Sequence, residues 1–185
     1  VWTVNLGNLA VRTDETYFMP IKYNVQVNTG DLKELRYCTD MICIDIGHMS
    51  IHNIDFVKHM PELTYLILAH TQVADITPLS SCKNLKFLEL DWSPVKDLTP
   101  LKECTALEDL NLGNTFADFE PVGEMTWLKN LWWKGAKYKT QELLRQSLPD
   151  TYMMFSSSYT VGSGWRELPN YYAQRDILGM WYMEG

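Results

Sequence analysis

The chain has 185 residues, of which 46% are hydrophobic, and it carries a formal net charge of −7. This acidic balance argues against nucleic-acid binding, where lysine and arginine contacts to phosphates supply most of the affinity, and against docking on anionic lipid. The sequence has no apolar run near the roughly 18 residues that a membrane-spanning helix needs, so we expect no membrane insertion.

Strand-like segments are indicated near the N-terminus. Residues 4–8 read VNLGN and closely match the LNLGN of residues 110–114, in which apolar and polar positions alternate. Val25 and Val27 indicate a second strand, whereas residues 12–24 fit no pattern that we can interpret.

The central part of the chain repeats every 22 residues. Leu63, Leu85 and Leu107 begin three successive copies, and Met41 begins one before them. Each copy opens with alternating apolar residues, as strands do, and places further apolar residues at fixed offsets. The pairs are Val4/Leu6, Val25/Val27, Ile44/Ile46, Leu66/Leu68, Leu88/Leu90, Leu110/Leu112 and Leu131/Trp133, with residues 152–155 as a final strand. A period of about 20–29 residues with this pattern is typical of leucine-rich repeats.

We therefore predict an α/β solenoid of about eight strands, a leucine-rich-repeat horseshoe. Its parallel sheet forms the concave face, and short helical or 3₁₀ turns form the convex face. Thr77-Pro78 and Thr99-Pro100 mark the start of two such turns, because Thr can cap a helix and Pro suits its first position.

The domain boundaries follow from where the repeat fades. The solenoid is predicted over residues 1–155, with the clearest repeats over 41–135, and a longer helix is expected over 139–150. Residues 156–185 are predicted to form a C-terminal loop and a capping helix that shields the end of the core.

Three of the four cysteines occupy the same position in successive copies. Cys38, Cys82 and Cys104 lie where other copies carry Met60 and Met125, so we expect free thiols inside the core. A disulfide between Cys82 and Cys104 is geometrically possible on neighbouring coils, but nothing in the sequence indicates one.

The stretch LTYLILAHTQVADITPLSSCKNL (63–85) resembles the 22-residue repeats of bacterial internalin-like leucine-rich-repeat proteins. Those repeats usually carry Asn at the ninth position, where this chain has Met49, Thr71, Ser93, Thr115 and Ala136. Thr and Ser hydroxyls would then have to satisfy the backbone groups that the Asn ladder normally serves. The tail GWRELPNYYAQRDILGMWYM also looks like the C-terminal segment of leucine-rich-repeat proteins from gut Firmicutes. The resemblance implies a secreted or cell-surface bacterial protein that binds a partner.

The outward-pointing strand residues give the candidate ligand-binding face. Large aromatic side chains are expected to be exposed there within an acidic surround, which suits a partner with basic or hydrogen-bond-donating groups. The candidate residues are His48, Tyr65, Ile67, His70, Phe87, Glu89, Asp91, Trp92, Asp109, Asn111 and Trp132. The alternative is that a terminal segment or a second subunit covers the aromatic residues.

Catalysis and metal binding are not expected. Cys43 and His48 are five residues apart on one strand, roughly 15 Å, which is beyond the reach of a nucleophile and its base. His48 and His70 stack on adjacent coils, but stacked surface histidines are usually solvated rather than metal-bound. We therefore expect no enzyme activity, no cofactor and no metal.

The sequence thus predicts a non-catalytic binding module for a protein partner. Two alternatives stay open, namely a glycan-binding surface, because tryptophan and tyrosine can stack on sugar rings, and a structural spacer within a larger bacterial surface protein.

Overall fold

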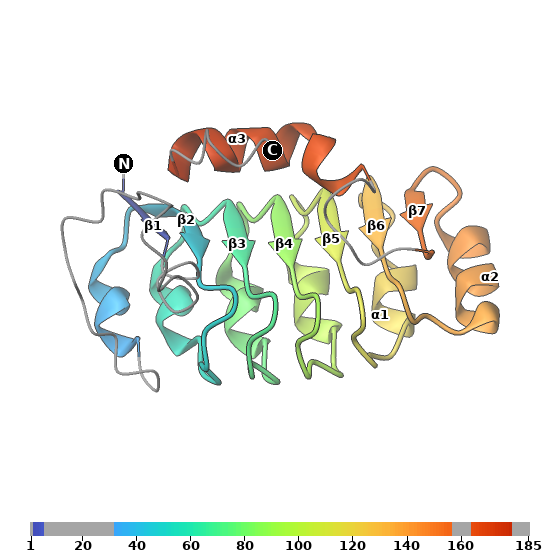
Figure 1. Cartoon of the computed structure of the whole chain (residues 1–185), viewed down its shortest axis with the longest axis horizontal. Coiled ribbons are helices and arrows are strands. Elements are labelled where there is room, and N and C mark those ends of the chain that lie inside the picture. Colours follow the sequence, from blue (N-terminus) through green and yellow to red (C-terminus); the bar gives the residue numbers. More distant parts are fainter. Residues whose placement is uncertain (1, 6–31, 157–163, 179–185) are drawn as a thin grey trace, which may run out of the picture.

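The computed structural model describes residues 2–5, 32–156 and 164–178. Seven strands form one parallel sheet in chain order (Figure 1). They are β1 (Trp2–Asn5), β2 (Met41–Asp45), β3 (Tyr65–Ile67), β4 (Phe87–Glu89), β5 (Asp109–Asn111), β6 (Asn130–Trp132) and β7 (Tyr152–Met154). The expected strand at Val25 and Val27 lies outside the described residues, and β1 pairs directly with β2.

A helical segment follows each strand from β2 to β6, and another precedes β2. The early coils use the 3₁₀ helices η1 (Lys33–Tyr37), η2 (Asp55–His59), η3 (Thr77–Ser81) and η4 (Thr99–Glu103), and the later coils use α1 (Glu120–Gly123) and α2 (Tyr138–Ser147). The predicted alternation of strand and short helical turn is confirmed. The fold is a leucine-rich-repeat solenoid.

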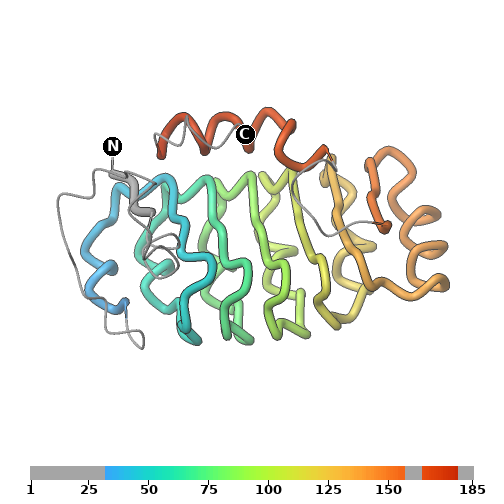
Figure 2. Tube along the Cα trace, viewed as in Figure 1, coloured from blue at the N-terminus to red at the C-terminus, as the bar shows by residue number. Residues whose placement is uncertain are grey.

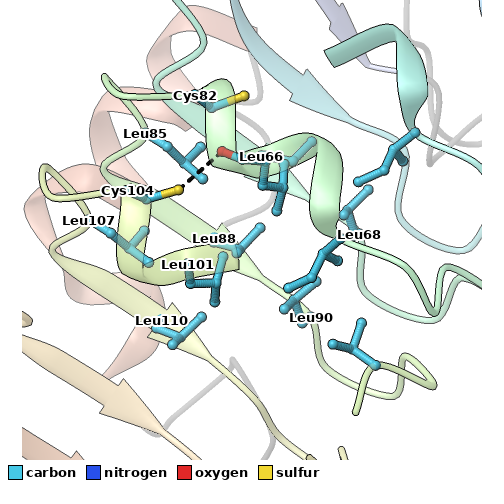
Figure 3. Packing of buried hydrophobic residues seen from close by; sticks show 14 of the residues in the cluster. Leu66, Leu68, Cys82, Leu85, Leu88, Leu90, Leu101, Cys104, Leu107 and Leu110 are labelled. Carbon is cyan, nitrogen blue, oxygen red and sulfur yellow. Dashed lines mark hydrogen bonds between the residues drawn. The ribbon is translucent and has the colours of Figure 1, made fainter. Parts of the chain in front are cut away.

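The 22-residue spacing keeps equivalent residues in register from coil to coil. Leu66 of β3 lies beside Leu88 of β4, which lies beside Leu110 of β5. Figure 3 shows these leucines meeting those of the helical turns, such as Leu101, in one continuous core. Cys38, Cys82 and Cys104 are free, as predicted; Cys82 and Cys104 are buried in the core, whereas Cys38 is only partly buried. The thiol of Cys104 donates to the carbonyl oxygen of Leu79 at 3.2 Å.

Aspartates, rather than the predicted threonines, support the start of the 3₁₀ turns. The carboxylate of Asp75 accepts a hydrogen bond from the backbone N–H of Thr77, and Asp97 does the same for Thr99, both at 2.8 Å. The proline occupies one of the first two positions of each turn, as expected. In each turn, the carboxylate thus accepts from the backbone N–H of the threonine two residues later, directly before the proline.

Side-chain hydroxyls replace the missing asparagine ladder, as the sequence indicated. Thr71, Ser93 and Thr115 are buried, and each hydroxyl donates to the carbonyl oxygen three residues earlier, at 2.7, 2.6 and 2.8 Å. The tight turns after β3, β4 and β5 are therefore satisfied locally, each within its own coil.

Contrary to the prediction, the C-terminal helix does not shield the end of the core. Residues 164–178, here called the C-terminal arm, contain η5 (Trp165–Glu167) and α3 (Pro169–Leu178). The arm crosses the sheet from the level of β6 back toward β1 and β2, on the side opposite the other helical segments (Figures 1 and 2). The sheet has its core on one face and the arm on the other.

Replacing Leu88 by alanine tests the strand register. Leu88 is fully buried, so we expect Leu88→Ala to lower the free energy of unfolding by about 2–5 kcal/mol. The exposed side chain of Lys86 is the matched control, and Lys86→Ala should change stability by less than about 0.5 kcal/mol. Chemical denaturation measures both values, and equal losses would show that the assigned register is wrong.

Candidate binding face

The outward strand residues form two columns along the sheet. In one column Tyr65, Phe87 and Asp109 lie side by side, and in the other Ile67, Glu89 and Asn111 do. The structure therefore brings the predicted face together. The prediction that this face is exposed is wrong. Phe87 and Trp132 are 0% and 1% exposed, and Glu89, Asp109 and Asn111 are also buried.

Trp165 of the C-terminal arm packs against three of these buried residues, Phe87, Trp132 and Glu89. Its ring centroid lies 4.8 Å from that of Phe87 and 5.2 Å from that of Trp132, and it is fully buried between them. The indole Nε1–H donates to a carboxylate oxygen of Glu89 at 3.0 Å. The Trp165 side chain is therefore held in two ways. Its ring inserts between two aromatic rings, and its N–H donates to a buried carboxylate.

A left-handed glycine positions this tryptophan. Gly164 has φ of 88°, a backbone conformation that residues with a Cβ rarely adopt. Gly164 thus lets the chain turn onto the face directly before Trp165.

Polar contacts hold the arm further along. The side-chain amide of Asn170 donates to Glu108 at 3.1 Å and to Asp109 at 3.0 Å. Tyr171 packs against Phe87, with ring centroids 6.2 Å apart, and the Arg166 guanidinium lies 5.9 Å from the Tyr171 ring centre. Donors on the arm therefore meet acceptors on the sheet.

The covered face is rich in carboxyl groups whose ionisation is unfavourable. Burial raises the pKa of Glu89 to about 7, against the opposing Trp165 hydrogen bond and with further raising by Asp45 and Asp91. Burial likewise raises the pKa of Asp45 to about 6, and it raises that of Asp109. The arm thus covers carboxyl groups for which burial favours the protonated form over the ionised form.

Four residues at the carboxyl ends of successive strands form a separate row, in which His48, His70 and Trp92 are exposed and Asn114 is partly buried. His48, His70, Trp92 and Asn114 all have φ between 55° and 62°, which is uncommon for bulky residues. The rings of His48 and His70 stack at 4.4 Å, and Trp92 follows at 5.9 Å. Trp92 is 57% exposed, so the predicted exposure is right for this tryptophan.

Asp91 lies beneath this row. Its carboxylate accepts a hydrogen bond from Asn114 at 3.2 Å and lies 3.8 Å from Nε2 of His70. Burial raises the pKa of Asp91 to about 6, while burial and the neighbouring His48 lower the pKa of His70. Among the described residues, no group of three or more His, Cys, Asp or Glu side chains is placed to hold a metal ion.

Sequence reasoning missed Trp165, Asn170 and Glu108. Trp165 follows a Ser/Gly loop, and the sequence does not reveal which part of the molecule it meets. The available signal was the presence of Phe87 and Trp132 on one face of the sheet. Large apolar side chains there predict a covering segment as readily as they predict a ligand.

Comparisons with known proteins agree with this fold. Residues 61–103 match the family described as Leucine Rich repeats (2 copies). No curated protein sequence matches significantly. The sequence and the sheet thus define the class, a leucine-rich-repeat solenoid similar to the internalins.

Three solved structures illustrate this similarity. An internalin, inlF, from Listeria monocytogenes is 20% identical, with a TM-score of 0.52 over 70% of this chain and 45% of that one. A leucine-rich-repeat protein from Leptospira interrogans is 21% identical, with a TM-score of 0.59 over 66% and 33% of the two chains. The plant peptide hormone receptor RGFR1, in complex with RGF2, is 14% identical, with a TM-score of 0.54 over 69% and 22%. The chain spans less than half of each of these structures.

Iodide quenching of tryptophan fluorescence tests the cover. Trp92 is largely exposed while Trp132 and Trp165 are buried, so Trp92→Phe should remove more of the quenchable signal than Trp132→Phe. Trp132→Phe is the matched control for the same substitution on the covered face. A larger loss of quenchable signal from Trp132→Phe would show that the face is open in solution.

The attachment of the arm should weaken as the pH rises. The pKa values of Glu89 and Asp45 are raised in the covered state, so their stabilisation is complete below their ordinary pKa values. It is lost as the pH rises through about 6 to 7. Hydrogen exchange of residues 165–178, corrected for intrinsic rates, should show protection falling on the order of tenfold or more between about pH 5 and about pH 8.

The matched variants identify the group responsible. Glu89→Gln keeps an acceptor for Trp165 but cannot ionise, so it should reduce this pH dependence, whereas Glu142→Gln at an exposed carboxylate should leave it unchanged. Protection that rises with pH in the unaltered chain would contradict the assignment.

Proposed function

We propose that this chain is a non-catalytic module that binds a protein partner through the concave face. One observation carries the proposal, namely that this face already holds a polypeptide segment. Trp165 inserts between Phe87 and Trp132 and donates to Glu89. Insertion of an aromatic anchor into a pocket, with polar contacts around it, is how protein interfaces obtain most of their affinity.

The contacts of the arm favour a cover that can leave. A purely structural cover gains most from apolar contacts, but here raised pKa values mark carboxyl groups that burial disfavours. The side-chain amide nitrogen of Asn111 and the amide oxygen of Gln174 are buried without a hydrogen-bond partner among the described residues. Each unsatisfied group costs about 1–3 kcal/mol, which lowers the cost of removing the arm.

The alternative functions have less support. Stacking of sugar rings needs open aromatic faces, and on the concave face Phe87 and Trp132 are buried. A spacer role is consistent with the covered face, and it requires that the arm never leaves. No helix in the described part of the chain is long and apolar enough to cross a membrane. From the resemblance to internalins alone, we propose that the protein acts outside the bacterial cell or at its surface.

A selection experiment distinguishes these functions. The full chain carrying Trp165→Ala and Asn170→Ala should have a weakly held arm, because both substitutions remove contacts to the sheet. Panning a library of displayed random peptides against this variant should enrich peptides that compete with one another for one site. The unaltered chain should enrich them less, since its own arm occupies the face.

A panel of plant and bacterial polysaccharides completes the test. Enrichment of peptides without saccharide binding supports the protein-binding proposal. Saccharide binding without peptides supports the glycan alternative, and binding of neither supports the spacer.

A further inference from the structure

The arm meets the face by matching donors to carboxylates. The indole N–H of Trp165 reaches Glu89 at 3.0 Å, and five residues later the Asn170 amide reaches Asp109 at 3.0 Å. The sheet supplies the acceptors and the arm supplies the donors. The Trp165–Glu89 contact is buried and the Asn170 contacts are partly buried. A mismatched donor or acceptor would therefore be costly, above all at Glu89, and the face selects for this pattern.

The arm also matches the shape of the face. The indole occupies the space between the rings of β4 and β6, and α3 then runs over the neighbouring strands to β2 and β1 (Figure 1). The outer side of α3 stays in contact with solvent, since Tyr172 and Asp176 are exposed. The face is thus filled by one helical segment of about three turns that starts after an aromatic anchor.

We propose that the C-terminal arm is a built-in ligand of the concave face, which its protein partner displaces with a segment of the same chemistry. That segment presents an indole for the space between Phe87 and Trp132. It also presents an amide or cationic donor about five residues later for Glu108 and Asp109, on a short helix. The inference rests on the proposed function, and it names the kind of partner.

A labelled peptide with the sequence of residues 164–178, GWRELPNYYAQRDIL, is the probe. Fluorescence anisotropy should show that the full chain with Trp165→Ala and Asn170→Ala binds it at least about tenfold more tightly than the unaltered chain, whose arm competes. In the peptide itself, Trp165→Ala should weaken binding by about tenfold or more, because truncation leaves Glu89 and the two rings without their partner.

The matched control is Tyr172→Ala in the same peptide. Tyr172 is exposed on the outer side of α3, so this substitution should change the affinity by less than about threefold. A second measurement on the unaltered chain guards against a Trp165→Ala and Asn170→Ala variant that fails to fold. There, excess peptide should raise hydrogen exchange in the chain's own residues 165–178.

Four results would overturn the inference. The first is a peptide that fails both to bind the variant and to raise exchange in the unaltered chain. The second is equal weakening by Trp165→Ala and Tyr172→Ala. The third is an unaltered chain that elutes as a dimer which excess peptide dissociates, because the occupant would then be the arm of a second copy. Displayed peptides that bind without an indole would overturn this inference and leave the proposed function intact.

Discussion

The in-register stacking of 22-residue coils is the constraint on which the rest of the structure depends. Each coil adds one short strand, and the register places Tyr65, Phe87 and Asp109 in one line across the sheet. Residues of one type that recur at the same position of the repeat therefore form a continuous surface along the sheet. On the inner side this produces the leucine core. On the outer side it gathers aromatic rings and carboxyl groups on one face, although each coil contributes only two or three of them.

That outer face cannot be left open without cost. Phe87 and Trp132 would expose large apolar area to water, and the C-terminal arm removes it by inserting Trp165. The same cover desolvates Glu89 and contacts Asp109, so apolar burial is gained together with an electrostatic penalty that donors on the arm offset in part. Opposing terms of this kind allow a segment to be well ordered and still replaceable by a competitor that makes the same contacts.

The sequence predicted the repeating fold well because its signals are local. The spacing of Leu63, Leu85 and Leu107, and the hydroxyls of Thr71 and Ser93, act within a coil or between neighbours. It also predicted which residues share the outer face. It gave their burial under a terminal segment only as the alternative, because the indole of Trp165 meets a carboxylate 76 positions earlier in the chain. A contact between distant segments leaves no periodic signal, and the helix expected to close the end of the solenoid crosses its face instead.

The most direct test of this account is the environment of the Trp165 indole in the unaltered chain. Nuclear magnetic resonance assigns the indole N–H and measures both its exchange with water and its Overhauser contacts. We expect slow exchange and contacts to the ring protons of Phe87, whose ring centroid lies 4.8 Å from that of the indole. Rapid exchange with no contact to Phe87 would show that the arm does not occupy the face, and it would contradict the account.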